Sequence, residues 1–67
     1  MIRITVNGES HQLPAPLNCA ELIAKLDLAG KRIALERNGE IVPRGSFSEQ
    51  TILDGDRLEI VVAVGGG

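Results

Sequence analysis

The stretch Leu17–Gly30, which reads LNCAELIAKLDLAG, decides the fold because it carries a full set of helix signals. Asn18 is a favourable N-cap residue, and Glu21 stands three positions later, as a capping box requires. Gly30 can adopt the left-handed conformation that commonly ends a helix. The sequence therefore predicts a helix over residues 19–29.

The predicted helix has a single apolar face. Its apolar residues recur at positions i, i+3, i+4 and i+7, which places them on one stripe; they are Cys19, Leu22, Ile23 and Leu26. One amphipathic helix in a short chain has to bury its stripe against a sheet.

Two hairpins flank this helix. Asn7-Gly8 separates the strand-like segments 2–6 and 9–13, and Asn38-Gly39 separates 33–37 from 40–42. Asn-Gly is the strongest short hairpin signal, because both residues tolerate positive φ. We expect residues 44–50 to be irregular, with a short helical piece.

A last strand is expected from Arg57 to Val62 or Ala63, with Leu58, Ile60 and Val62 facing inward. The first and last strands are the most apolar, so they are expected side by side and parallel at the centre. This order predicts an α+β, β-grasp (ubiquitin-like) fold: a mixed four- to five-stranded sheet with one main helix packed across it. Residues 1–62 would form this domain and residues 63–67 a flexible C-terminal tail ending in Gly-Gly-Gly.

Composition excludes several classes of function. The 67 residues suffice for one domain, and 43% of them are hydrophobic. The net charge is −2, the basic residues are scattered and Phe47 is the single aromatic residue, so no nucleic-acid partner is expected. The sequence starts with strand-like residues and has no long apolar run, which predicts no signal peptide, no membrane partner and a cytoplasmic setting.

The reactive side chains give no catalytic site. Cys19 could be a helix-start thiolate, but its place on the apolar stripe favours core packing. His11 lacks a triad partner and is expected to be structural. Asp54 and Asp56 bracket Gly55 in a segment too short for a calcium loop, so turn chemistry explains them better than a metal. We expect neither a cofactor nor a metal.

The last three residues, Gly65, Gly66 and Gly67, have two interpretations. They could be a trimmed linker or cloning remnant. Alternatively, residues 63–67 form a thin arm that reaches about 17 Å when extended and carries a terminal carboxylate into a partner's cleft. Adenylation by ATP would make that carboxylate an electrophile, and a sulfur nucleophile could then displace AMP. In this interpretation Gly67 is the reacting residue, and Gly65 and Gly66 thread into the partner's active site.

Apolar residues also lie on the outward side of the last strand and in the tail, namely Val61, Ala63 and Val64. Ordinary surface exposure is one explanation. The other is a partner interface beside the tail.

The whole chain resembles the ThiS family, the sulfur carriers of thiamine (thiazole) biosynthesis. The resemblance rests on Val6-Asn7-Gly8, on the central segment 36–44 (ERNGEIVPR) and on the closing run from Leu53 to Gly67. Each motif alone is weak. Their order, in a chain of this length with a Gly-Gly end, is specific.

The resemblance implies that Gly67 is adenylated by an E1-like adenylyltransferase (ThiF-like) and converted to a thiocarboxylate with sulfur from a donor protein. The sulfur would then pass to thiazole synthase (ThiG-like). The carrier would be a protein cosubstrate and not an enzyme. A molybdopterin-type sulfur carrier and a β-grasp interaction module without carrier chemistry remain the alternatives, and ubiquitin-like tagging is less well supported, because Val64-Gly65 replaces the Arg before Gly-Gly.

Overall fold

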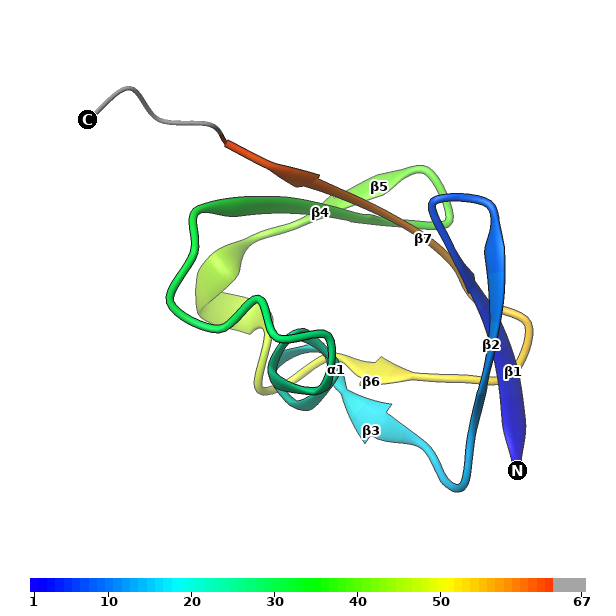
Figure 1. Cartoon of the computed structure of the whole chain (residues 1–67). Helices are drawn as coiled ribbons and strands as arrows, with labels where there is room; N and C mark the ends of the chain where they lie inside the picture. Colours follow the sequence, from blue (N-terminus) through cyan, green and yellow to red (C-terminus); the bar gives the residue numbers. More distant parts are fainter. Residues whose placement is uncertain (64–67) are drawn as a thin grey trace.

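A five-stranded mixed sheet and one helix, α1 (Cys19–Lys25), form the two layers of the computed structural model, which describes residues 1–63 (Figure 1). The strand order is β2-β1-β7-β4-β5. The strands are β1 (Ile2–Val6), β2 (Glu9–Leu13), β4 (Ile33–Arg37), β5 (Glu40–Val42) and β7 (Arg57–Val62).

The central pair, β1 and β7, is parallel, and every other pair in this sheet is antiparallel. Both Asn-Gly turns close their hairpins, with Asn7 and Asn38 each at φ 52°. This is the predicted β-grasp arrangement, and the bounds of all five strands agree with the sequence prediction. The 3₁₀ helix η1 (Arg44–Ser46) is the short helical piece expected in the irregular segment.

The start of α1 is the predicted capping box. The Oδ1 of Asn18 accepts a hydrogen bond from the Glu21 N–H at 2.8 Å, and Oε1 of Glu21 accepts one from the Asn18 N–H at 2.9 Å. Two of the helix's free backbone donors are thus satisfied. A two-residue ladder, β3 (Leu17–Asn18) with β6 (Thr51–Ile52), holds this end of the helix and was not predicted.

The predicted end of the helix, at Ala29 with Gly30 as cap, is wrong. The helix ends at Lys25, and Asp27 takes the left-handed conformation at φ 62°. The Leu28 N–H donates to the Ile23 carbonyl at 2.9 Å, which is the six-to-one bond of a Schellman motif. Sequence reasoning placed the cap on glycine, but aspartate also tolerates this conformation.

Replacing Asp27 with glycine should therefore raise the free energy of unfolding by about 0.5–1 kcal/mol, because glycine adopts positive φ without a steric penalty. Urea denaturation measures the change. The matched control is Ala29→Gly, at an exposed position with ordinary negative φ, which should lower stability or leave it unchanged. Equal effects of the two substitutions would contradict the assigned cap.

The core lies between α1 and the inner face of the sheet. Cys19, Leu22 and Ile23 of the predicted stripe are buried there, whereas Leu26, as the C-cap, is half-buried. Leu58 and Ile60 face inward as predicted, but Val62 is 39% exposed. The other buried apolar residues are Ile2, Ile4, Val6, Leu13, Leu35, Val42, Phe47 and Ile52.

Candidate functional site

The last described residues of β7 lead toward the tail and are held on one side by β4. Val61 lies opposite Ala34 in the antiparallel ladder, and the Ala63 N–H donates to the Arg32 carbonyl at 2.9 Å. On the other side, the ladder with β1 reaches only as far as Leu58. The end of β7 is thus one-sided before the tail begins, which means that its backbone is paired with a neighbouring strand on the β4 side alone.

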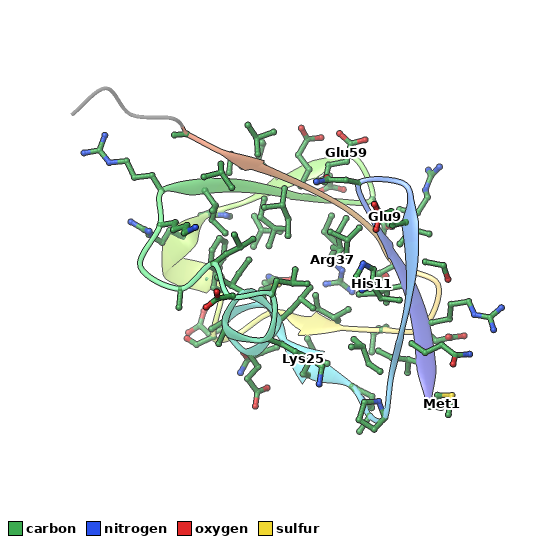
Figure 2. All side chains as sticks on the ribbon, in the orientation of Figure 1. Met1, Glu9, His11, Lys25, Arg37 and Glu59 are labelled. Atoms are coloured by element: carbon green, nitrogen blue, oxygen red, sulfur yellow. The ribbon has the colours of Figure 1, made fainter. Side chains whose placement is uncertain are left out.

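Val61 points away from the core, as predicted, and is 64% exposed. On the same outer face the cross-strand pair of Glu36 and Glu59 lies next to the pair of Ala34 and Val61. Glu59 points away from the helix in Figure 2. Like charges directly opposite each other destabilise a sheet, so Glu36 and Glu59 repel each other. This face therefore combines apolar side chains with two carboxylates.

Both asparagines of the hairpin turns bind β7 through their carboxamides. Asn7 bonds with both backbone groups of Ile60, and the Oδ1 of Asn38 accepts a hydrogen bond from the Arg57 N–H at 2.9 Å. Sequence analysis interpreted these residues as turn formers alone. Nothing in the local sequence indicates that their side chains bond to a strand that is distant along the chain.

Asp56 is the second feature that sequence analysis missed. It is buried, with 7% of its surface exposed, and its carboxylate accepts hydrogen bonds from Arg37 Nε at 2.8 Å, Asn38 Nδ2 at 3.1 Å and the Leu53 N–H at 2.9 Å. Arg37 points into the interior between sheet and helix (Figure 2). Asp54, its neighbour in the sequence, is exposed and accepts a hydrogen bond from the Arg3 N–H at 2.7 Å. The pair serves turn structure as predicted, but Asp56 also forms a partly buried ion pair with Arg37.

The other reactive residues have the environments that the sequence predicted. Cys19 is fully buried, and burial raises the pKa of its thiol, while the Arg37 charge lowers that pKa by a smaller amount and the Asp56 charge raises it slightly further. A buried thiol with a raised pKa is a poor nucleophile. His11 is half-buried on β2, opposite Ile4. Within residues 1–63, no three side chains of His, Cys, Asp or Glu are grouped to hold a metal.

Four predicted site residues, Val64, Gly65, Gly66 and Gly67, lie outside the described residues. The other two candidate interface residues are described: Val61 lies in β7, Ala63 follows its last residue, and both are exposed. The proposed reacting residue, Gly67, comes four positions after Ala63 in the sequence. In the described part of the chain, no helix is long and apolar enough to cross a membrane.

Similar proteins point to one family. The chain is 38% identical to a thiazole synthase from Paramagnetospirillum magneticum, over 98% of this chain but 20% of that protein. It thus spans about a fifth of that enzyme's length. It is 30% identical to the sulfur carrier protein ThiS of Escherichia coli, over 98% of this chain and 100% of that protein.

A solved structure agrees. The crystal structure of the thiamine biosynthesis protein ThiS from Geobacter metallireducens superposes with a TM-score of 0.84 at 35% identity, covering 98% of this chain and 100% of the other. A model of the ThiS family matches residues 4–67, which includes the glycines beyond the described part. The chain therefore belongs to the ThiS family.

Proposed function

We propose that this chain is a sulfur carrier whose Gly67 carboxylate is adenylated and then converted to a thiocarboxylate for thiazole formation. The observation that carries the proposal is the family match through residue 67, which covers both the β-grasp body and the three glycines that follow its central strand after Ala63 and Val64. The environments of Cys19 and His11 support it, because neither suits catalysis by the chain itself.

The proposed chemistry has two steps. A carboxylate oxygen of Gly67 attacks the α-phosphorus of ATP, and pyrophosphate leaves to give an acyl-adenylate. A hydrosulfide ion, HS⁻, then attacks the acyl carbon and loses its proton, and AMP leaves with the former carboxylate oxygen, so that the product is the thiocarboxylate. The carrier supplies the acyl group and its position. Because Cys19 is buried, the sulfur would come from a separate donor protein.

Three partners follow from this chemistry: an E1-like adenylyltransferase, a sulfur donor protein and thiazole synthase. The resemblance of the chain to one segment of two thiazole synthases supports the last of these. Fusion of a carrier-like segment to that enzyme is the arrangement expected if the two act together, since linkage raises their effective concentration.

Adenylation can be tested by isotope exchange. Incubation of the chain with an E1-like adenylyltransferase, ATP and labelled pyrophosphate should incorporate label into ATP, because acyl-adenylate formation is reversible. The matched control is the same chain with its terminal carboxylate converted to an amide, which should support no exchange. Exchange that does not depend on the chain, or that continues with the amide, would contradict the proposal.

The outer face of β7 is the expected docking surface. Val61→Asp should weaken binding to the adenylyltransferase at least about tenfold, or about 1.4 kcal/mol, because it places a third carboxylate beside Glu36 and Glu59 in a dry contact. The thermal midpoint of the free chain should change little, because Val61 is 64% exposed. Titration calorimetry and thermal unfolding measure the two effects.

Ile41→Asp is the matched control. Ile41 is 65% exposed and lies on the same face, but β5 is the far edge strand, two positions from β7. If docking is centred beside the tail, Ile41→Asp should weaken binding less than Val61→Asp. A loss of stability equal to the loss of binding would instead remove Val61 from the interface.

A further inference from the structure

The backbone of β1 supports only the first part of β7. The parallel ladder pairs Thr5 with Arg57 and Val6 with Leu58, and the Asn7 N–H donates to the Leu58 carbonyl at 2.9 Å. At that point the chain turns back into β2. Main-chain contact between β1 and β7 thus ends at Leu58.

The carboxamide of Asn7 extends this support by two residues. Its Oδ1 accepts a hydrogen bond from the Ile60 N–H at 2.8 Å, and its Nδ2 donates to the Ile60 carbonyl at 3.0 Å. In a longer parallel ladder, two different residues of β1 would make these bonds with the N–H and the carbonyl of Ile60. Both bonds are partly buried, and the left-handed backbone of Asn7 aims its side chain at β7. The carboxamide of Asn7 therefore supplies both the acceptor and the donor that a longer β1 would have supplied.

We propose that Asn7 is a positioning residue for the carrier reaction, in that its carboxamide makes Ile60 the last residue of β7 that is held from both sides before the chain continues, paired with β4 alone, toward the reacting carboxylate. This role rests on the proposed function. Without the carboxamide, the last residue of β7 held from both sides would be Leu58 instead of Ile60. The one-sided segment would then begin two residues, or about 7 Å of strand, earlier.

Position matters because the carboxylate has to reach one place in a partner's cleft. Misplacement by about 1 Å can lower a rate roughly a hundredfold. A longer one-sided segment gives the arm more conformations, and more of them are unproductive. Loss of the carboxamide should therefore reduce the rate of the reaction by more than its effect on folding explains.

Asn38 provides a matched comparison within the same molecule. It has the same turn position and the same φ of 52°, and its Oδ1 accepts a hydrogen bond from the backbone of β7. Its carboxamide, however, bonds to Arg57, at the start of β7 and far along the strand from the tail, and its Nδ2 donates to Asp56. A purely structural role of the two carboxamides would lower stability in both variants and would give Asn7→Gly no larger loss of reaction rate than Asn38→Gly.

The experiment compares Asn7→Gly with Asn38→Gly. Glycine tolerates the left-handed turn, so each substitution removes a carboxamide and leaves the backbone conformation accessible. At a temperature where both variants are folded, kcat/KM for thiocarboxylate formation should fall about tenfold to a hundredfold in Asn7→Gly. It should remain near the wild-type value in Asn38→Gly. Hydrogen exchange of the Ile60 amide should become faster in Asn7→Gly alone.

Asn7→Asp tests the loss of the hydrogen bond to the Ile60 carbonyl without the loss of side-chain volume that Asn7→Gly also causes. Aspartate adopts the same backbone region, as Asp27 does here, but it presents an acceptor to the Ile60 carbonyl where asparagine presents a donor. Its kcat/KM should fall as well. Equal losses in Asn7→Gly and Asn38→Gly, or wild-type activity in both Asn7 variants, would overturn the positioning role. Failure of the wild type to be thiolated would instead overturn the proposed function, and this role with it.

Discussion

Replacing Asp56 with alanine is expected to lower the free energy of unfolding by roughly 3–5 kcal/mol, because it leaves the Arg37 guanidinium without its counter-ion in a partly buried site. The change also removes the acceptor of the Asn38 amide and of the Leu53 N–H. A domain of this size has a total stability of about 5 kcal/mol, so about 0–2 kcal/mol would remain and up to roughly half of the molecules should be unfolded at 25 °C. Circular dichroism during urea titration measures the loss.

Asp54→Ala is the matched control, because Asp54 has the same side chain two positions away. Its hydrogen bond to the Arg3 N–H is exposed, so its loss should lower stability by only about 0.5–1.5 kcal/mol. Similar losses for the two variants would mean that the partly buried ion pair of Arg37 and Asp56 does not carry the stability assigned to it. Asp56→Asn, which keeps the shape of the side chain, should fall between them.

The contrast between the two aspartates shows where sequence reasoning ends. Both stand in a turn signal and were interpreted alike. Asp56 is set apart by Arg37, which is 19 residues away along the chain, and Asn7 gains its role from Ile60, which is 53 residues away. Neither partner can be identified from local pattern, because only the folded sheet brings them together.

The fold itself was predictable because short-range rules specify it. The Asn-Gly turns fix two hairpins, the Asn18–Glu21 box fixes the start of α1, and the alternation of residues fixes the inner face of each strand. The predicted end of the helix was wrong because Asp27, and not Gly30, is the left-handed residue that ends it. Val62 lies on the side of Ile60 and Leu26, as predicted, but it is 39% exposed, and strand alternation alone does not reveal that the core ends at Ile60.

For the candidate site, Val61 and Ala63 could be placed on the outer, exposed side of β7 from alternation alone, and the structure confirms that exposure. The role of the glycines has a different basis. It follows from chemistry and from family membership, and it stays a prediction for Gly67. The central claim therefore depends on the terminal carboxylate and on its distance from the body.

Adding one alanine after Gly67 should abolish carrier function without affecting folding. The extension moves the carboxylate by more than 3 Å and adds a side chain next to the nucleotide, and a misplacement of about 1 Å already lowers rates roughly a hundredfold. An alanine inserted between Met1 and Ile2 is the matched control, because Met1 is exposed outside β1. That variant should react like the wild type.

The most direct measurement is intact-mass spectrometry of the chain after incubation with ATP, the E1-like adenylyltransferase and a sulfur source. The wild type should gain the mass expected when one oxygen is replaced by sulfur, and fragmentation should place the change on Gly67. The extended variant should show no such product. Thiolation of the extended variant to the wild-type level, or sulfur located on Cys19, would contradict the carrier function and favour an interaction module without carrier chemistry.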